Sequence, residues 1–368
     1  MKIAVLSSHT PSLFWFRMDM MQEFLRQGHK VVAVGNEKEA KWKDSFRKKK
    51  IDYRQAEISR NGTNPLQDLK TFRSLKKILK EEMPDKIFTY QAKTIIYGAC
   101  AAQQLKIDEV YPLIAGIGSV FLSDSLKTRI IRTIVKLEYK FAMKRCPRYF
   151  FQNPDDVKIF RKLGIIDPDR VVLLHGSGVN LDTFSLQPLP DEPVFLCVSR
   201  LIRDKGIYEY LEAARRVKKE YPKARFLLVG PYDSNPSAIT PAELKPYIDQ
   251  NIIEYFGEQN DVRPYLAQCC VFVLPSYREG TPKSVLEAMA CGRAILTSDA
   301  PGCRETVVNG KNGYLIPVQD IEGLFRKICE MIESPSLVKK MAEESRKMAE
   351  EKFDVRLVNQ KILQTMKL

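Results

Sequence analysis

The stretch Val271-Phe-Val-Leu-Pro275, followed by Glu279-Gly-Thr-Pro-Lys-Ser-Val-Leu-Glu287, decides the fold of this chain. The first part is a short apolar run that predicts a fully buried strand. Gly280 and Pro282 then predict a tight loop, and the residues from Lys283 onward predict a helix. A strand, a loop and a helix in this order are typical of an open α/β sheet, in which ligands bind at the carboxyl ends of the strands.

The same stretch carries two carboxylates that can reach one crevice. Glu279 lies before the predicted helix, and Glu287 lies about one turn inside it. A helix N-terminus offers N–H groups and a positive dipole end, so it suits a phosphate group. The pair also fits two different roles: the carboxylates are solvated or capping charges, or they are the acid and nucleophile of a hydrolase.

Alternating strands and helices extend this pattern along the chain, which favours two parallel sheets of the doubly wound kind. Between them, Ser185–Pro193 is rich in proline and predicts an interdomain linker. The predicted strands are Lys2–Ser7, Lys30–Val34, Lys86–Tyr90, Arg148–Gln152, Arg170–Leu174, Val194–Ser199, Arg225–Val229, Ile252–Phe256, Cys270–Leu274, Ala294–Thr297 and Tyr314–Ile316. The predicted helices are Phe14–Gln27, Pro65–Glu82, Thr94–Gln104, Lys127–Arg145, Ile207–Lys219, Val262–Ala267, Lys283–Ala290, Ile321–Glu333 and a tail, Ser336–Met366, interrupted near Phe353.

Composition narrows the class of protein. The chain has 368 residues, which suggests two domains, and 44% of them are hydrophobic, as in ordinary globular proteins. No apolar run approaches the about 18 residues of a transmembrane helix, and the chain begins directly with a strand rather than with a secretory signal. The eight cysteines show no Cys-x-x-Cys spacing, so we expect reduced thiols in a cytosolic protein.

The net charge of +14 is unevenly distributed, since residues 1–183 carry +13 of it. A basic first half predicts an acidic partner: nucleic acid, an anionic membrane surface or an acidic small molecule. The predicted helix Lys127–Arg145 is amphipathic, and we expect it to form one basic face with Lys41–Lys50 and Lys70–Lys80. This face serves either solubility or docking on anionic lipid. Its helical cations are Arg129, Arg132, Lys136, Lys140 and Lys144.

Three loops of the second half are expected at one edge of its sheet. They are Ser199–Gly206, the loop at Gly230, and the Glu279–Glu287 segment. Arg200 and Lys205 would place two cations beside a helix N-terminus, which predicts a diphosphate site. A hydrolase has no need for such a cradle. Glu287, on the adjoining helix, suits a ribose diol because a carboxylate accepts two hydroxyl hydrogen bonds.

These segments resemble the retaining glycosyltransferases of family 4, which have the GT-B architecture of two facing Rossmann-like domains. The resemblance implies an acceptor-binding domain, residues 1–184 completed by 353–368, and a nucleotide-sugar-binding domain, residues 192–352. It also implies that the last helix returns to the first domain. The matching motifs are Ser199-Arg-Leu with Lys205-Gly206, the Glu279/Glu287 pair, Glu287-Ala-Met-Ala-Cys-Gly292, Pro301-Gly-Cys-Arg-Glu305, Asn309-Gly310 and Asn312-Gly313, with Gly176-Ser-Gly-Val-Asn180 in the first half.

The resemblance also implies roles for single residues. Arg200 and Lys205 would bind the donor diphosphate, Glu287 the ribose, and Glu279 the transferred sugar. Further candidates for binding the donor are Gly230 and five residues of the Glu279–Glu287 segment: Gly280, Thr281, Lys283, Ser284 and Val285.

Two residues of the first half are also candidates for phosphate contact. Arg17 and Lys93 follow predicted strands, and for both a surface role is the alternative. Many family members carry a histidine in the first domain, whereas the equivalent stretch here, Pro112–Ser119, has none. The group that activates the acceptor is therefore not identified. Asp167-Pro-Asp169 is similar to a metal-binding Asp-x-Asp motif, but its proline and its place before a strand predict a turn.

Within the family, the chain looks most similar to bacterial enzymes that extend lipid-linked glycans. This resemblance implies transfer of a sugar from a nucleotide diphosphate donor, UDP-linked, to a polyprenyl-diphosphate-linked saccharide, with retained anomeric configuration. Such reactions build capsule, O-antigen and related surface glycans. We expect a cytosolic enzyme, peripheral on the inner face of the cell membrane, that needs no cofactor and no metal because protein cations neutralise the diphosphate. The alternatives are a nucleotide-sugar epimerase of the same shape and a basic nucleic-acid-binding protein. The latter lacks any helix-turn-helix or aromatic-basic RNA motif, so no nucleic-acid partner is expected.

Overall fold

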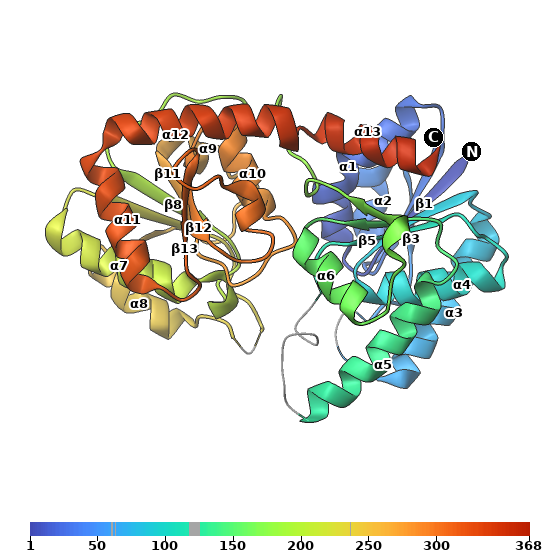
Figure 1. Cartoon of the computed structure of the whole chain (residues 1–368). Coiled ribbons are helices and arrows are strands. Elements are labelled where there is room, and N and C mark those ends of the chain that lie inside the picture. Colours follow the sequence, from blue (N-terminus) through green and yellow to red (C-terminus); the bar gives the residue numbers. More distant parts are fainter. Residues whose placement is uncertain (60–61, 63, 118–125, 236) are drawn as a thin grey trace. The chain divides into compact units, whose positions relative to one another are not determined.

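The structure, a computed structural model, describes residues 1–59, 62, 64–117, 126–235 and 237–368. The chain folds as two compact units: unit 1 comprises Met1–Ser177 and Val355–Leu368, and unit 2 comprises Gly178–Asp354. Each unit contains one parallel sheet with helices packed against it (Figure 1). The predicted α/β class with two doubly wound domains is confirmed, while the predicted domain limits stay predictions.

The sheet of unit 1 has the strand order β3-β2-β1-β4-β5-β6-β7, and every pair is parallel. The order reverses direction between β1 and β4, so the carboxyl ends of these two strands form the topological switch point of the unit. The strands are β1 Lys2–Ser7, β2 Lys30–Gly35, β3 Asp52–Gln55, β4 Lys86–Tyr90, β5 Val110–Ile114, β6 Tyr149–Phe151 and β7 Val171–Leu173.

Helices cover both faces of this sheet because successive side chains of a strand point to opposite sides. Ala4 and Leu6 of β1 face a core closed by α3, η1, α4 and α5, whereas Ile3 and Val5 face a core closed by α1, α2 and α13. The helical segments are α1 Thr10–Arg26, α2 Glu39–Arg47, α3 Pro65–Glu82, the π-helix η1 Thr94–Gly98, α4 Ala99–Gln104, α5 Leu126–Met143, α6 Pro154–Lys162 and the 3-10 turn η3 Pro168–Arg170.

This arrangement corrects the basic face expected from the sequence. The segment Lys41–Lys50 overlaps α2, which packs through Phe46 on one face of the sheet. In contrast, α3 and α5 pack on the other face, through residues such as Leu75 and Met143. The three segments are therefore divided between the two sides of unit 1, because the βα alternation places consecutive helices on either face.

The last helix belongs to the core of unit 1, as expected. The segment α13 (Val355–Met366), red in Figure 1, follows the helices of unit 2, and its Val358 and Ile362 are buried in the core that α1 closes. Lys86 Nζ at the start of β4 donates to the Met366 carbonyl oxygen at 2.6 Å. The end of the chain is therefore an integral part of its first domain.

Unit 2 has the strand order β10-β9-β8-β11-β12-β13, again parallel throughout, with its switch point between β8 and β11. Its strands are β8 Val194–Val198, β9 Arg225–Val229, β10 Glu254–Tyr255, β11 Val271–Leu274, β12 Ala294–Ser298 and β13 Gly313–Ile316. Its helical segments are η4 Arg203–Lys205, α7 Ile207–Glu220, α8 Pro241–Asp249, α9 Arg263–Gln268, α10 Lys283–Ala290, η5 Arg304–Thr306, α11 Ile321–Glu333, α12 Pro335–Met348 and the π-helix η6 Ala349–Phe353.

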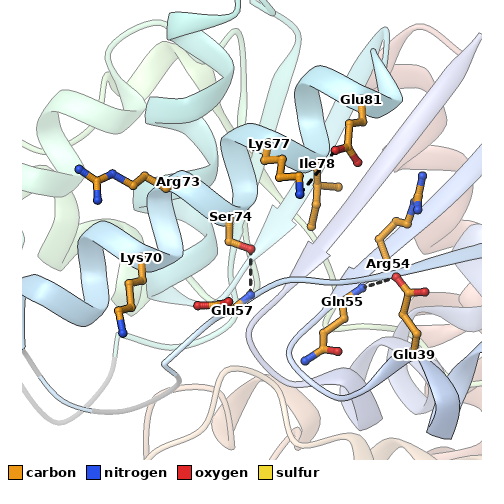
Figure 2. Close-up of a pocket in the computed structure, with 10 residues that line it drawn as sticks. All are labelled: Glu39, Arg54, Gln55, Glu57, Lys70, Arg73, Ser74, Lys77, Ile78 and Glu81. Carbon is orange, nitrogen blue, oxygen red and sulfur yellow. Dashed lines mark hydrogen bonds and ion pairs between the residues drawn. The ribbon is translucent and has the colours of Figure 1, made fainter.

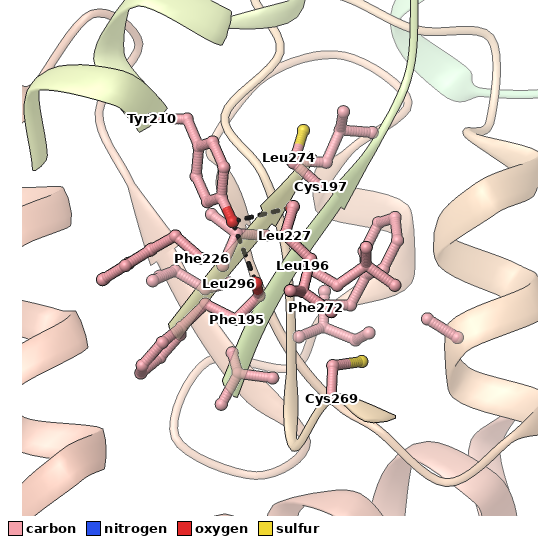
Figure 3. Packing of buried hydrophobic residues seen from close by; sticks show 14 of the residues in the cluster. Phe195, Leu196, Cys197, Tyr210, Phe226, Leu227, Cys269, Phe272, Leu274 and Leu296 are labelled. Carbon is pink, nitrogen blue, oxygen red and sulfur yellow. Dashed lines mark hydrogen bonds between the residues drawn. The ribbon is translucent and has the colours of Figure 1, made fainter. Parts of the chain in front are cut away.

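The core of unit 2 is apolar with few polar insertions (Figure 3). Phe195 of β8 stacks on Phe226 of β9 with ring centroids 5.1 Å apart. The hydroxyl of Tyr210, on α7, lies 3.0 Å from the carbonyl oxygens of Phe195 and Leu227, so this buried polar group is satisfied. All eight cysteines are free thiols. The hydrogen bonds of Tyr210 fix α7 on the sheet and thereby fix the loop that precedes α7.

Candidate active site

Two loops of unit 2 meet at its switch point. One follows β8 and spans residues 199–206, and the other follows β11 and spans residues 275–282. The backbone N–H of Tyr277 donates to the Asp204 carbonyl oxygen at 2.9 Å, and Ser276 Oγ donates to the same oxygen at 3.1 Å. Ligands of doubly wound sheets bind at this position, so the geometry agrees with the predicted place of the site.

Lys205 and Glu279, one from each loop, form an ion pair. Their side chains are only 18% and 14% exposed, so water screens their charges weakly. The Glu279 backbone N–H donates to the Pro301 carbonyl oxygen at 2.9 Å, which fixes the loop from the other side. The sequence predicted both residues for the site, and the structure brings them into direct contact.

Arg200 is paired with a carboxylate that the sequence did not point to. Its Nη1 lies 2.7 Å from Oδ2 of Asp233, in the loop after β9. Gly230 allows this loop to approach, because a Cβ at Gly230 would lie 1.8 Å from the Ser199 carbonyl oxygen. Arg200 and Lys205, the two cations predicted to bind the diphosphate, thus come from one loop. Arg200 is paired with Asp233 and Lys205 with Glu279, and these two carboxylates come from two different loops.

Two helices direct their N-termini to the same edge, and no N-cap side chain occupies either of them. The N-cap of α7 is Gly206, whose φ of +70° suits glycine and whose Cβ would lie 2.1 Å from the Pro275 carbonyl oxygen. The N-cap of α10 is Pro282, which has no side-chain donor or acceptor. The positive ends of both helix dipoles therefore favour an anion here.

The other predicted residues of this loop differ in burial. Thr281 is buried, whereas Lys283 and Ser284 are half-buried in the first turn of α10. The side chain of Val285 belongs to the apolar core, and its backbone N–H donates to the Pro282 carbonyl oxygen at 3.1 Å. Val285 thus serves packing through its side chain.

Glu287 lies on α10 with its side chain partly buried. Burial raises the pKa of Glu287 from 4.5 to about 7, although the nearby Lys283 opposes the shift. A carboxylate whose pKa is raised by burial is stabilised when hydroxyl groups donate to its charged form. The environment of Glu287 is therefore compatible with the predicted contact to a diol.

A partly buried hydrogen bond between Glu209, in the first turn of α7, and Tyr277 also ties the loop after β11 to α7, and sequence reasoning missed it. The Tyr277 hydroxyl donates to Glu209 Oε1 at 2.7 Å, and Glu209 Oε2 is buried without a hydrogen-bond partner. Burial and the neighbouring carboxylate raise the pKa of Tyr277 to about 12. In the sequence, Glu209 looks like an ordinary acidic residue of the first helical turn, so no local signal marks it.

Arg17 and Lys93 belong to unit 1. The Arg17 guanidinium is buried, lies 4.9 Å from the ring centroid of Tyr90, and keeps its Nε without a hydrogen-bond partner. This burial lowers the pKa of Arg17. Lys93 is ion-paired with Asp68, and both side chains are largely buried. Their contact with a phosphate stays a prediction.

The switch point of unit 1 contains a strained residue that the sequence does not signal. Gln91, directly after β4, has a φ of +74°, which is uncommon for a residue with a side chain. Its Oε1 accepts hydrogen bonds from Ser8 N at 2.9 Å and Ser7 Oγ at 2.8 Å, and the π-helix η1 begins three residues later. Strained backbones and π-turns concentrate at functional sites, so this edge is a second candidate site.

Hollows also lie elsewhere in the described part of the chain. One, of about 600 Å³, lies between β3 and α3, and its lining mixes cations such as Lys70 and Arg73 with carboxylates such as Glu57 and Glu81 (Figure 2), so its charges do not clearly select an anion. Another, of about 1460 Å³, lies in unit 2 below the proline-rich segment 186–193 and is mainly apolar. Neither includes the residues of the two switch points.

The sequence predicted that Asp167-Pro-Asp169 is a turn rather than a metal site, and it showed no histidine in the stretch Pro112–Ser119. Asp167 Oδ1 accepts from the Asp169 N–H at 3.1 Å, so Asp167-Pro-Asp169 is the predicted turn. Among the residues that the structure describes, no three His, Cys, Asp or Glu side chains are grouped so that they could hold a metal ion. Gly118 and Ser119, which end the stretch without a histidine, lie outside the described residues.

Within residues 1–59, 64–117, 126–235 and 237–368, no helix is both long enough and apolar enough to cross a bilayer.

Solved structures share this architecture. The sucrose-phosphate synthase of Thermosynechococcus elongatus superposes with a TM-score of 0.81 at 19% identity, covering 100% of this chain and 98% of that one. The Anabaena protein HepE, solved in complex with UDP and glucose, superposes with a TM-score of 0.79 at 17% identity, covering 100% and 99%. At such identities the likeness shows the fold alone, which is the expected GT-B arrangement of Rossmann-like domains.

Sequence relatives identify the family. Residues 180–348 match the family model for glycosyl transferases group 1, and residues 2–145 match that for glycosyl transferase 4-like proteins. The chain is 27% identical to an Escherichia coli UDP-Gal:alpha-D-GlcNAc-diphosphoundecaprenol alpha-1,3-galactosyltransferase, covering 74% of this chain and 72% of the relative. It is 30% identical to the N,N'-diacetylbacillosaminyl-diphospho-undecaprenol alpha-1,3-N-acetylgalactosaminyltransferase of Campylobacter jejuni, covering 99% and 97%. The chain therefore belongs to the group 1 glycosyl transferases, as its resemblance to glycosyltransferase family 4 implied, and it is a glycosyltransferase.

Proposed function

We propose that this enzyme transfers a hexosyl residue from a UDP-sugar to a polyprenyl-diphosphate-linked saccharide, with retained anomeric configuration. The names of both relatives above specify acceptors linked to undecaprenol through a diphosphate, and the Escherichia coli relative uses UDP-Gal. Further relatives belong to capsular polysaccharide and colanic acid biosynthesis. The product would accordingly be a lipid-linked precursor of a surface polysaccharide.

The observation that carries the proposal is the Lys205–Glu279 ion pair, placed between two loops at the switch point and beside the N-termini of α7 and α10. A diphosphate seated there would meet Lys205, Arg200 and two helix dipoles. The sugar attached to its terminal phosphate would face Glu279, and the ribose at its other end would face Glu287.

The chemistry follows from where charge develops. The bond between the anomeric carbon and the diphosphate oxygen breaks, and the electron pair stays on the diphosphate. The acceptor hydroxyl forms the new bond to that carbon and gives its proton to the departing diphosphate or to water. Cations and helix dipoles already fixed around the leaving oxygen stabilise the transition state more than the ground state, an effect of about 3 kcal/mol per donor group. We propose that these protein charges make a metal ion unnecessary.

The acceptor would bind to unit 1. Its switch point offers the polar groups around Gln91 and Ser8 to saccharide hydroxyls. The positive charge of residues 1–183 supports peripheral attachment to the inner, anionic face of the cell membrane, where lipid-linked saccharides are embedded. On this proposal the enzyme is cytosolic and has no nucleic-acid partner.

The deciding experiment supplies the purified enzyme with a panel of UDP-sugars and an undecaprenyl-diphosphate-linked saccharide. We expect sugar transfer that depends on the acceptor, and thermal stabilisation by UDP of about 2.7 kcal/mol at 100 times its dissociation constant. Conversion of the UDP-sugar to an epimer without any acceptor, or the absence of stabilisation by every nucleotide diphosphate, would refute the proposal.

A further inference from the structure

Arg17 is a buried cation of unit 1 that lacks the counter-charge which buried cations normally have. It belongs to α1 and is only 3% exposed. Among the residues that the structure describes, no oxygen accepts a hydrogen bond from its guanidinium, and no carboxylate lies within ion-pair distance of it. The guanidinium carbon lies 4.9 Å from the ring centroid of Tyr90, so the charge rests on an aromatic face.

The other buried cations of the described chain show what a structural role requires. Lys86, which is 8% exposed, forms an ion pair with Glu109 at 2.8 Å. Arg293 is fully buried, and both of its Nη atoms donate to the Pro188 carbonyl oxygen at 3.0 Å. Each of these two cations holds a second segment of the fold in place through a polar contact, whereas Arg17 holds none in this way.

The burial of Arg17 is unfavourable for the protein alone. An arginine cannot shed its charge in a protein, and an unpaired charge that is moved from water into an apolar core is among the most costly groups to bury. The contact with the Tyr90 ring compensates this cost only in part. Stability therefore gives no reason for an arginine at this position, but a ligand that brings a negative charge does.

The guanidinium lies at the edge of unit 1 where a ligand is expected. Tyr90 is the last residue of β4, whose carboxyl end forms the switch point together with that of β1. The Tyr90 hydroxyl lies 2.9 Å from Ser12 Oγ, and Gln91 Nε2 donates to the same Ser12 Oγ at 3.4 Å. Arg17 thus belongs to the same edge as Gln91, which is proposed to meet saccharide hydroxyls.

The end of the Arg17 side chain is the part that a ligand can reach. Within the described part of the chain, Nε is the guanidinium nitrogen that is enclosed without a partner, so Nη1 and Nη2 form the accessible side of the group. Two N–H groups held side by side match two oxygens of one phosphate, which is how arginine binds phosphate in a bidentate manner.

We propose that Arg17 binds a phosphate of the acceptor, and that this contact selects acceptors whose saccharide is joined to a diphosphate. The inference rests on the proposed function, which supplies such an acceptor and assigns it to unit 1. The saccharide lies on the Gln91 side of the switch point, and the diphosphate lies on the Arg17 side. The charge of +13 on residues 1–183 attracts the same anion to this unit.

The test compares two acceptors that carry the same saccharide. In one the saccharide is linked to a polyprenyl diphosphate, and in the other it is linked to an uncharged alkyl chain. We expect the parent to prefer the first in kcat/KM, and Arg17→Met to lose about 10- to 100-fold of this preference, as when a hydrogen bond to a charged group is lost. Arg17→Lys keeps the charge but not the planar fork, so its preference should be intermediate. UDP affinity should be unchanged in both variants.

Stability separates a ligand-binding arginine from a structural one. Methionine fills a similar volume without burying a charge, so Arg17→Met should unfold at the same urea concentration as the parent or at a higher one. Arg293→Met is the matched control, because it leaves the Pro188 carbonyl oxygen without its donors and should unfold at a lower concentration. Arg26→Met, at an exposed position of the same helix, should change neither stability nor acceptor preference.

A further measurement needs no acceptor. UDP at saturating concentration first occupies the proposed donor site, and inorganic diphosphate is then added. We expect diphosphate to raise the melting temperature of the parent but not that of Arg17→Met. An equal effect on the two proteins, or no effect on the parent, would overturn the proposal.

The kinetic results can overturn it as well. An undiminished acceptor preference in Arg17→Met does so, and so does an equal loss of activity on both acceptors together with lower stability. A loss of UDP affinity with the preference intact would assign Arg17 to the donor instead. A parent that transfers sugar equally well to both acceptors would refute the role of Arg17 and leave the proposed reaction standing. A parent that transfers no sugar to either would refute the reaction, while stabilisation by diphosphate that depends on Arg17 would still support the anion site.

Discussion

The Arg200 guanidinium donates to the Asp233 carboxylate, with Nη1 2.7 Å from Oδ2, so a cation expected to bind the donor already has a partner. A diphosphate must compete with Asp233 for Arg200 or share it. Replacing Asp233 with Ala should therefore strengthen UDP binding, by up to about fivefold, since a half-exposed ion pair contributes about 1 kcal/mol or less. Calorimetry with UDP measures this.

Glu243→Ala is the control for that prediction. It removes the carboxylate partner of Arg203, which lies in the same loop as Arg200, and it should leave UDP affinity unchanged. Weaker binding of UDP to the Asp233→Ala protein would show instead that Asp233 positions Arg200 for the phosphate.

Arg200→Ala and Lys205→Ala should each reduce turnover by roughly 10²–10³, the usual loss when one fixed donor to a developing charge is removed. The measurement is the initial rate of sugar transfer at saturating UDP-sugar. Arg203→Ala supplies a matched loss of charge in the same loop, and we expect it to retain activity. Near-normal rates in both Arg200 and Lys205 variants, with folding intact, would remove the diphosphate assignment.

The two carboxylates should separate by function. Glu287→Gln keeps the shape but loses the charged acceptor of the ribose, so UDP affinity should fall. Glu279→Gln should reduce transfer while UDP affinity stays equal or rises, because Lys205 is then relieved of its carboxylate partner. Calorimetry with UDP and rates of transfer on both proteins distinguish these outcomes. An equal loss of UDP affinity in the two variants would contradict this division of roles.

Glu287 should also make stability depend on pH. Burial raises its pKa from 4.5 in the unfolded chain to about 7 in the folded protein. Between these values the folded state retains a proton that the unfolded state has lost, so the free energy of unfolding decreases as pH rises from 4.5 to 7. Urea denaturation of the parent and of Glu287→Gln at several pH values tests this. The difference between the two proteins should change within this window and be constant below it.

Gln91 should affect the acceptor rather than the donor. Gln91→Ala removes the oxygen that accepts from Ser7 and Ser8, so the loop after β1 should lose its position. We expect a higher KM for the lipid-linked saccharide and an unchanged affinity for UDP. Gln104→Ala, which removes an exposed partner of Lys76, is the control. A change in UDP affinity alone would place Gln91 outside the acceptor site.

The sequence predicted the strands of unit 2 well because each is a compact apolar run bounded by turn residues. Two strands of unit 1 were missed for physical reasons. Pro112 cannot donate to a sheet, so Val110–Ile114 does not look like a central strand, yet β5 pairs on both sides. The edge strand β3, Asp52–Gln55, is short and polar.

The site was predictable where one loop carries its own signal, and not where distant segments meet. Arg200, Lys205, Glu279 and Glu287 could be chosen as candidates because they lie in loops marked by glycine and proline, at the ends of apolar runs. Asp233 and Glu209 act through partners 33 and 68 residues away along the chain. The exposed apolar side of α5, which includes Ile134 and Phe141, could not be predicted for another reason: periodicity shows that a side is apolar, but only packing shows which apolar side remains exposed.

The return of α13 to unit 1 has a consequence for biosynthesis. The core that α1 and β1 share is closed by Val358 and Ile362, which the ribosome adds only after the whole of unit 2. At about 5–20 residues per second, synthesis of the intervening 178–354 segment takes roughly 10–35 s. During this interval the apolar side chains of α1 and β1 lack the cover that α13 gives them in the folded protein. A nonsense mutation in the codons for residues 355–368 would therefore damage the domain that was translated first.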